Sequence, residues 1–134
     1  MRISRIRKED VIAQNWKPEP HTVSLKDEGE WWGCISEDNR LLSVVCVSDK
    51  HGGKYFSETF TPVEYRGKGL CSTLLGYLAK QIYKDDLLIA HCLKASVNCY
   101  KFAGFKLEKV RHFKYGDQYF MKKEVSDGKT KNRD

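Results

Sequence analysis

The stretch Glu64–Ser72 reads E-Y-R-G-K-G-L-C-S and joins a strand-like segment to an amphipathic helix. Before it, residues 55–61 are rich in aromatic and hydroxyl side chains, which is typical of a strand. After it, apolar residues recur about every 3.6 positions and predict one apolar helical face. These residues are Leu70, Leu74, Leu75, Leu78 and Ile82. The sequence therefore predicts a strand, a glycine turn and a helix, in that order.

The glycine turn has the features of an anion site. Gly67 and Gly69 carry no Cβ, so the main chain there can turn tightly and approach a ligand closely. The first turn of the following helix has amides without intrahelical acceptors and a positive dipole end, which favour a phosphate. Arg66 and Lys68 add positive charge. From these residues alone, the alternative is a glycine turn with two solvated cations, because the spacing fits neither a Walker A loop nor a dinucleotide fingerprint.

Three segments resemble the GCN5-related N-acetyltransferase (GNAT) family, in the order that the family has. Arg66–Cys71 resembles the Arg/Gln-x-x-Gly-x-Gly/Ala loop, which in that family binds the pyrophosphate of acetyl-CoA. Tyr100–Phe105 (Y-K-F-A-G-F) resembles the family's L-Y-E-K-L-G-F segment, where a helix ends at glycine and a strand begins. Lys114–Glu124 resembles the family's closing hairpin. The resemblance covers roughly residues 31–125 and implies an acetyltransferase.

The order of predicted elements indicates an α/β (α+β) protein, with a mixed, mostly antiparallel central sheet and helices on both faces. The expected strands are 2–6, 31–36, 41–48, 55–61, 87–90, 105–111 and 118–124, and the expected helices begin near 8 and span about 69–84 and 95–103. The resemblance implies that the parallel strands 55–61 and 87–90 splay and hold the cofactor between them. It also implies that the polar segment 17–30 covers the acceptor site, and its short, irregular character suggests a shallow or open groove.

Length and charge leave several partners open. The 134 residues suit a single domain over 1–125, while the charged residues 126–134 lack apolar anchors and we expect them to be a disordered tail. A net charge of +6 suits an anionic partner: a nucleotide-like cofactor, nucleic acid or a membrane surface. The apolar run 41–47 is far too short to span a bilayer.

The cysteines and the N-terminus predict a cytoplasmic protein without a metal site. The five cysteines are odd in number and form no Cys-x-x-Cys pair, so we expect reduced thiols. Charged residues occupy the N-terminus where a secretory signal would need its apolar stretch.

The resemblance implies a set of cofactor contacts. The pantetheine arm would meet main-chain groups of Thr59, Phe60 and Thr61. The pyrophosphate would bind at Arg66, Gly67, Lys68, Gly69, Leu70, Cys71 and Ser72. Two positions depart from the family pattern. Cys71 replaces a glycine or alanine, and Leu93 replaces an asparagine seven residues before the family tyrosine, a contact that Asn98 could supply instead.

Two residues are candidates for proton transfer. Tyr100 matches the family tyrosine that protonates the leaving sulfur, and the alternative is a ring that packs under the sheet. Glu58 is the candidate general base, since alternation along the strand can turn it toward the acceptor. A surface ion pair for Glu58 and a water relay for the amine proton are equally open. His91 and His112 are more often structural residues at strand ends.

These observations support three hypotheses. The first is an N-acetyltransferase that passes acetyl from acetyl-CoA to a primary amine by direct attack in a ternary complex. The second is a non-catalytic acyl-CoA-binding module of the same fold. The third is a small basic nucleic-acid binder, suggested by Trp31, Trp32 and residues 106–114, but core tryptophans and a solvated hairpin explain these residues better. The acceptor is a small-molecule or protein amine, no membrane is expected, and the protein is a monomer or a homodimer.

Overall fold

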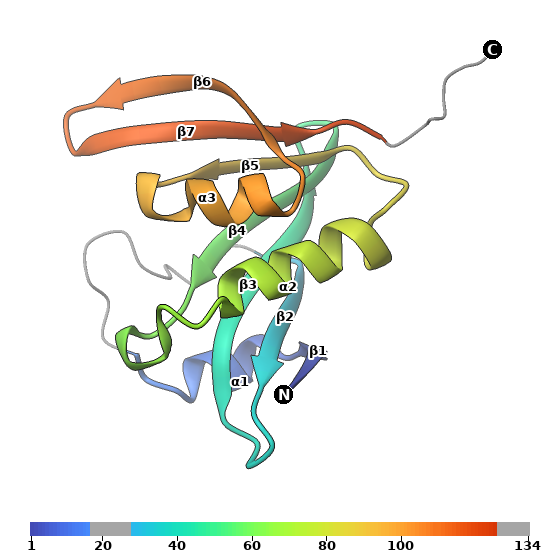
Figure 1. Cartoon of the computed structure of the whole chain (residues 1–134), viewed down its shortest axis with the longest axis vertical. Helices are drawn as coiled ribbons and strands as arrows, with labels where there is room; N and C mark the ends of the chain where they lie inside the picture. The colour runs from blue at the N-terminus through green and yellow to red at the C-terminus, as the bar shows by residue number, and fades with distance from the viewer. Residues whose placement is uncertain (17–27, 126–134) are drawn as a thin grey trace.

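Seven strands form one sheet in the computed structural model, which describes residues 1–16 and 28–125 (Figure 1). The strand order is β1-β2-β3-β4-β5-β7-β6. The strands are β1 (Arg2–Ile6), β2 (Glu30–Ile35), β3 (Leu41–Lys50), β4 (Gly53–Phe60), β5 (Leu88–Cys92), β6 (Lys106–Phe113) and β7 (Gly116–Lys123). The helices are α1 (Lys8–Ile12), η1 (Val63–Tyr65), α2 (Leu70–Tyr77), η2 (Leu78–Ile82) and α3 (Lys94–Phe102).

Every neighbouring pair of strands is antiparallel except β4 and β5, which run parallel. The sequence prediction of a mixed, mostly antiparallel sheet is therefore confirmed. In Figure 1 the helices α2 and α3 lie in front of the sheet and α1 lies behind it, so both faces carry helices, as expected. The parallel pair lies where the chain crosses from β4 through α2 to β5.

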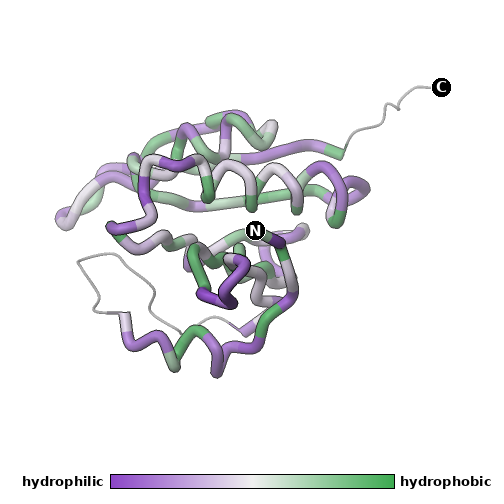
Figure 2. The backbone as a smooth tube through the Cα atoms, turned by 60° about the horizontal axis from the view of Figure 1, so that its bottom comes forward, coloured by the Kyte–Doolittle hydropathy of each residue, from purple (hydrophilic) through white to green (hydrophobic). Residues whose placement is uncertain are grey.

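Two apolar clusters fix the helices on the two faces. The larger joins α2 and α3 to the sheet through fully buried side chains such as Leu74, Phe56 and Tyr100. The smaller holds Val11 of α1 against Trp31 and the far side of β3 and β4. Along the tube of Figure 2, hydrophobic and hydrophilic residues alternate at short range. This alternation is what gives each strand and helix one buried side.

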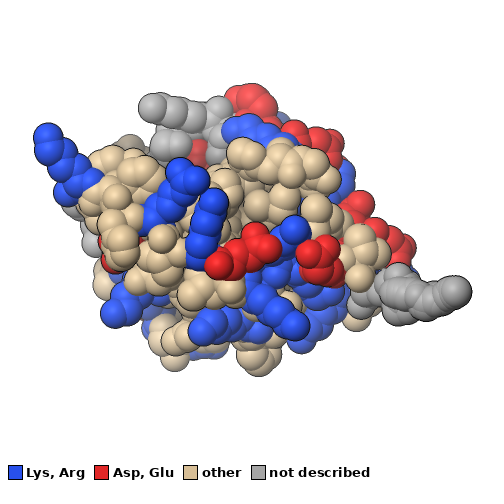
Figure 3. Space-filling view, turned by 90° about the horizontal axis from the view of Figure 1, so that it is seen from above, with Lys and Arg blue, Asp and Glu red and all other residues tan. Residues whose placement is uncertain are grey.

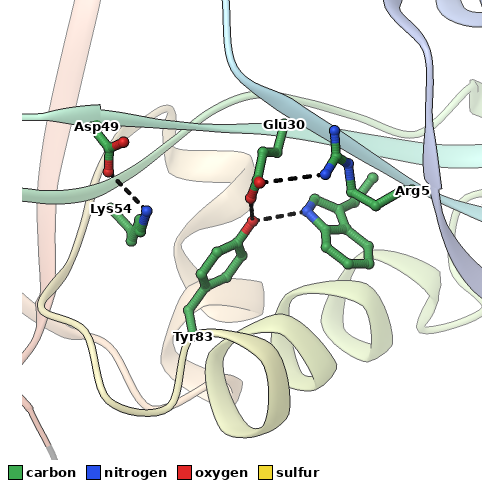
Figure 4. Close-up of polar contacts among 6 residues, drawn as sticks. Arg5, Glu30, Asp49, Lys54 and Tyr83 are labelled. Atoms are coloured by element: carbon green, nitrogen blue, oxygen red, sulfur yellow. Dashed lines mark hydrogen bonds and ion pairs between the residues drawn. The ribbon is translucent and has the colours of Figure 1, made fainter.

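The second half of the helix that follows the glycine turn differs from the prediction. A regular helix was expected to about residue 84, but α2 ends at Tyr77 and continues as the wider turn η2. In that turn the Tyr83 amide donates to the Leu78 carbonyl, five residues back, at 2.8 Å. The Tyr83 hydroxyl then accepts from the indole of Trp32 at 2.9 Å and donates to Glu30 (Figure 4). The wider turn thus docks the helix end onto β2.

The two hairpin turns are shorter than predicted. Strands β3 and β4 leave only His51 and Gly52 between them, both at positive φ (58° and 83°), which suits a two-residue hairpin. Strands β6 and β7 leave Lys114 and Tyr115, so Gly116 begins β7 instead of forming the turn. Most of the expected cover segment, residues 17–27, and the expected tail, 126–134, lie outside the described residues.

Candidate functional site

An extra residue in β4 shapes the site. Val44 of β3 pairs with Phe60, and Cys46 pairs with Ser57, so one residue of β3 faces two of β4, Glu58 and Thr59. Glu58 has a φ of 57°, in the left-handed region that side chains other than glycine rarely adopt. This is a β-bulge, which bends the strand and increases its twist.

Beyond the start of the bulge, β4 and β5 separate. Their parallel pairing covers three residue pairs and ends at Phe56 and Ala90 within the described residues. A cleft of about 100 Å³ opens after this point. It is lined by Phe56, Ser57, Glu58, Thr59, His91, Cys92, Leu93, Ser96 and Tyr100. The two parallel strands thus diverge, and side chains from β4, β5 and α3 meet between them.

Tyr100 lies at the bottom of this cleft. Its ring is almost fully buried and makes edge contacts with Phe56 and Phe105. Its hydroxyl lies 2.6 Å from the Thr59 hydroxyl. Burial raises the pKa of Tyr100 well above its usual value, and the bond with Thr59 opposes this rise in part. The ring therefore packs in the core, as one alternative from the sequence has it, and the residue also lines the cleft. The role in proton transfer stays a prediction.

The end of β4 is tied to its neighbours. The Ser43 hydroxyl contacts the Phe60 carbonyl at 3.3 Å and the Thr61 hydroxyl at 2.7 Å. The Arg66 Nε donates to the Thr61 carbonyl at 2.7 Å, and its guanidinium lies 5.7 Å from the Phe60 ring centroid. Arg66 thus anchors the glycine turn to β4 and keeps its charge beside it.

The glycine turn is open to solvent. Gly67 and Gly69 have φ values of 81° and 76°, which confirms the tight turn that the sequence predicts. A Cβ placed on either glycine would meet no atom within 4 Å, so space remains on this side of the turn. Gly69 is the N-cap of α2 and makes no side-chain cap bond, and the first amides of a helix have no intrahelical acceptor. Lys68 is exposed, while Leu70, Cys71 and Ser72 are partly buried.

Cys71 lies against Cys99 of α3. All five cysteines are free thiols. The hydrogen bond between the two thiols raises the pKa of Cys71, and burial raises it further. The same bond lowers the pKa of Cys99 to about 6. Burial opposes this lowering, and a hydrogen bond with Ser72 adds to it.

The cleft also contains residues that the sequence did not single out. Ser57 and Ser96 line it, and His91, which we had considered a structural residue, does so too. The alternation of side chains along β4 and β5 could have indicated which strand residues face the cleft. Using it requires knowing that these two strands pair, and one sequence does not show this. Leu93 lines the cleft at the N-cap of α3.

Two residues considered from the sequence lie elsewhere. Asn98 is exposed on α3 and is not among the lining residues of the cleft. His112 is exposed and lies 2.7 Å from Asp117 in the β6–β7 hairpin.

A larger depression of about 570 Å³ lies at the opposite end of β4. It is lined by the β3–β4 turn and by Asp85, Asp86 and Leu87. It touches neither the bulge nor the glycine turn, so we place the candidate site at the smaller cleft. Within residues 1–16 and 28–125, no cluster of His, Cys, Asp and Glu could hold a metal ion.

Comparison with solved structures agrees with this geometry. A phosphinothricin acetyltransferase of the GNAT superfamily from Sinorhizobium meliloti, solved with acetyl-CoA, is 19% identical with a TM-score of 0.61, over 78% of this chain and 65% of its own. A spermidine N-acetyltransferase from Vibrio cholerae is 15% identical with a TM-score of 0.66, over 97% of this chain and 98% of its own. The chain has the GNAT fold.

A third GNAT-like structure, AAC(6')-Ib solved with paromomycin and acetyl-CoA, is 13% identical with a TM-score of 0.67, over 98% of this chain and 97% of its own. No protein-family model matches the sequence, and no curated protein matches it either. At these identities the likeness establishes the GNAT fold alone. Among the described helices, none combines the length and apolar character that a membrane span needs.

Proposed function

We propose that the protein is an acetyl-CoA-dependent N-acetyltransferase, which transfers the acetyl group to a primary amine by direct attack in a ternary complex. One observation carries the proposal: the bulge at Glu58 separates β4 from β5 directly above a buried tyrosine hydroxyl. The solved GNAT-fold structures of the S. meliloti enzyme and AAC(6')-Ib contain acetyl-CoA, which supports the same cosubstrate here.

The described residues fit acetyl-CoA along its length. The open turn at Gly67 and Gly69 offers main-chain amides and the positive end of α2 to the pyrophosphate, with Arg66 and Lys68 beside it. Residues 59–61 lie beyond the last β4–β5 pair of the described chain, Phe56 and Ala90, and this is where the pantetheine arm would meet the main chain. When bound, acetyl-CoA supplies an activated thioester.

The chemistry then needs two proton transfers. The amine nitrogen forms a bond with the carbonyl carbon of the acetyl group, the carbon–sulfur bond breaks, and the nitrogen gives up a proton. Glu58 lines the cleft and is the candidate to accept that proton, directly or through water. A main-chain amide of β4 near the bulge would stabilise the developing oxyanion, an effect worth about 3 kcal/mol per donor.

Tyr100 is the candidate donor to the leaving sulfur. If the Thr59 hydroxyl donates to the Tyr100 oxygen, the phenol proton is left to point into the cleft. The phenol holds its proton at neutral pH, and burial raises its pKa further. The raised pKa makes Tyr100 a weaker acid, so we place its proton transfer in the step where negative charge develops on the leaving sulfur. The proton lost from the amine balances the one gained by CoA.

The test combines binding and turnover. We expect calorimetry to detect CoA binding, and thiol release from acetyl-CoA with a panel of primary amines to identify an acceptor. Tyr100→Phe should lower kcat by about 10²–10⁴-fold with unchanged CoA affinity, whereas the exposed Tyr115→Phe should change neither. Absence of CoA binding would refute the proposal. Binding without turnover on any amine would favour the non-catalytic module, for which Leu93 in the cleft is the motivating residue.

A further inference from the structure

An aromatic patch lies beside the cleft, on the sheet face opposite α2 and α3. The rings of Tyr55, His91 and Phe120 follow one another across β4, β5 and β7. The ring centroids are 5.1 Å apart between Tyr55 and His91, and 4.1 Å apart between His91 and Phe120. The ring of His51 lies 5.0 Å from that of His91. Because His91 also lines the cleft, the aromatic patch made by these four residues is continuous with the candidate site.

Two cations of β6 cover the outer end of the aromatic patch. The Lys109 ammonium lies 5.0 Å from the Phe120 ring centroid, and the Arg111 guanidinium lies 5.6 Å from it. Both side chains are exposed, and neither forms an ion pair with any residue of the described chain. Figure 3 looks onto this end of the molecule, where Lys and Arg side chains are spread with a row of carboxylates among them.

Carboxylates on and next to the β6–β7 hairpin are engaged with other groups. Lys122 lies 3.8 Å from Glu108 and 3.3 Å from Glu124, and His112 lies 2.7 Å from Asp117. The charges of Lys109 and Arg111 are therefore not neutralised locally. Their effect reaches the cleft: burial lowers the pKa of His91, and the charges of His51, Lys109 and Arg111 lower it further.

The cleft itself has one carboxylate among its described lining residues, Glu58. The hydrogen bond with Glu28 raises the pKa of Lys8, and the charge of Glu58 adds to this rise, so Glu58 already lies in the field of a cation. A polyamine needs several acidic groups along its length, and it would instead meet Lys109 and Arg111 here. Charges of like sign oppose each other at close range, which disfavours a polycationic acceptor.

We propose that the acceptor is an anionic amine, that is, a primary amine that also bears a carboxylate or a phosphate. Its anionic group binds Lys109 and Arg111 over Phe120, and its amine reaches Glu58 in the cleft. This inference rests on the proposed acetyl transfer, since it names the substrate class of the same site.

The first experiment measures binding at the aromatic patch by NMR. Isotope-labelled protein saturated with CoA is titrated separately with inorganic phosphate, succinate and spermidine, and the ring signals of His91 and Phe120 are followed. We expect one or both dianions to shift these signals at millimolar concentration, less so at high salt, and spermidine not to shift them. Comparing phosphate with succinate distinguishes the two anionic groups.

Two matched double variants identify the cations that bind. Lys109→Ala with Arg111→Ala should weaken dianion binding by about tenfold, the effect expected for two exposed charge pairs. Lys84→Ala with Lys101→Ala removes the same charge from exposed positions near and on the helices and should leave the affinity unchanged. Three results would each overturn the proposal. The two double variants could weaken dianion binding equally, neither dianion could shift the ring signals, or spermidine could shift them as much as the dianions do.

The second experiment measures turnover with acceptors that differ only in charge: O-phosphoethanolamine against ethanolamine, and glycylglycine against glycinamide. We expect a lower KM for the anionic member of at least one pair, and a higher KM with little change in kcat in the Lys109/Arg111 double variant. If CoA does not bind, the proposed transfer fails. In that case the dianion titration can be repeated with CoA-free protein. The ring signals of His91 and Phe120 still report binding at the aromatic patch, because they do not come from the glycine turn at residues 67–72.

Discussion

Glu58 adopts a φ of 57°, a conformation in which its Cβ crowds the neighbouring carbonyl oxygen. The pairing of β3 with β4 on both sides of it holds the residue there, because Val44 and Cys46 both keep their partners. Residues held in such sparsely populated conformations cost of order 1–3 kcal/mol and tend to occur at functional sites. The strained residue here is also the candidate base.

A substitution series at Glu58 separates conformation from chemistry. Glu58→Gly should be more stable than Glu58→Ala by about 1 kcal/mol, because glycine adopts positive φ without the Cβ penalty. Both variants, and Glu58→Gln as well, should slow acetyl transfer because all three lack the carboxylate. Denaturant unfolding and thiol-release kinetics measure the two effects. A Glu58→Gly protein less stable than Glu58→Ala would contradict the strain argument.

Gly69 and Gly52 form a second comparison at the scale of single residues. Their φ values are 76° and 83°, and an added Cβ would meet nothing within 4 Å at either position. Replacing either glycine with alanine should therefore lower stability by about 1 kcal/mol through the backbone alone. Only Gly69→Ala should also weaken CoA binding, because only that turn begins α2. Urea unfolding measures the stabilities and calorimetry measures the CoA affinities. Equal CoA affinity in both variants would contradict CoA binding at the turn that begins α2.

At the scale of elements, the end of α2 is held by a polar network and not by apolar contacts alone. Tyr83 follows the wide turn η2 and bonds to Trp32 and Glu30 of β2, and Glu30 lies 3.3 Å from Arg5 of β1 (Figure 4). The network therefore links the helix to two strands. This link fixes the direction in which α2 carries the glycine turn at its other end.

Tyr83→Phe removes the hydroxyl that completes this network. We expect it to lower the free energy of unfolding by about 1–2 kcal/mol, because the Trp32 N–H and Glu30 each lose a partner. Tyr77→Phe, on the exposed side of α2, should have little effect. Chemical denaturation measures both, and an unchanged Tyr83→Phe stability would mean that water replaces the hydroxyl at no cost.

The same residue gives a pH dependence. Burial, followed by the bond with Glu30, raises the pKa of Tyr83 above its value of about 10 in unfolded chains. The folded state thus holds this proton more tightly, and the resulting stability is present below pH 10 and is lost as the pH rises further. Wild-type protein should lose stability between about pH 10 and pH 12 more steeply than Tyr83→Phe does, as thermal unfolding over that range would show.

What the sequence could predict at this scale was local. Glycines at 67 and 69 and the apolar spacing that begins at Leu70 are features of one segment, and they were enough to predict the turn and the start of α2. The end of α2 depended on Tyr83 meeting Trp32, a residue 51 positions away. The bulge at Glu58 likewise depended on the register with β3, which no single segment reveals.

The candidate site also combines features that one segment of sequence reveals with features that depend on distant contacts. The resemblance of residues 100–105 to the GNAT segment was enough to single out Tyr100, and this residue does lie in the cleft. Its contact with Thr59 joins residues 41 positions apart. His91 was discounted because a histidine at a strand end has no local signature, and its place in the cleft follows only from the pairing of β5 with β4.

At the scale of the whole molecule, the sheet consists of two antiparallel blocks, β1–β4 and β5–β7, joined by one short parallel pairing. We call this parallel pairing of β4 with β5 the seam. It has only three residue pairs in the described chain and ends at Phe56, so few main-chain hydrogen bonds hold the two blocks together. Local opening has its lowest free energy where contacts are few. The candidate site lies at the open end of this seam.

Hydrogen exchange should therefore be uneven across the sheet. We expect amides of residues 57–61 and 67–72 to exchange faster than those in the middle of β3, and CoA to slow exchange at those two segments first. At a CoA concentration 100 times its Kd, the protein should also gain about 2.7 kcal/mol of stability. Mass-spectrometric exchange with and without CoA measures this. Uniform protection across all strands would contradict a ligand bound at the seam.

The loop at Lys84–Leu87 connects η2 to β5, the first strand of the second block. A chain cut there would divide into an N-terminal piece that ends with α2 and η2 and a C-terminal piece that carries Tyr100 and the closing hairpin. Neither piece would have both walls of the cleft, so CoA would act as the bridge between them. The two pieces would also share the larger apolar cluster between α2 and α3, so a bound CoA would strengthen a reassembly that this cluster already favours.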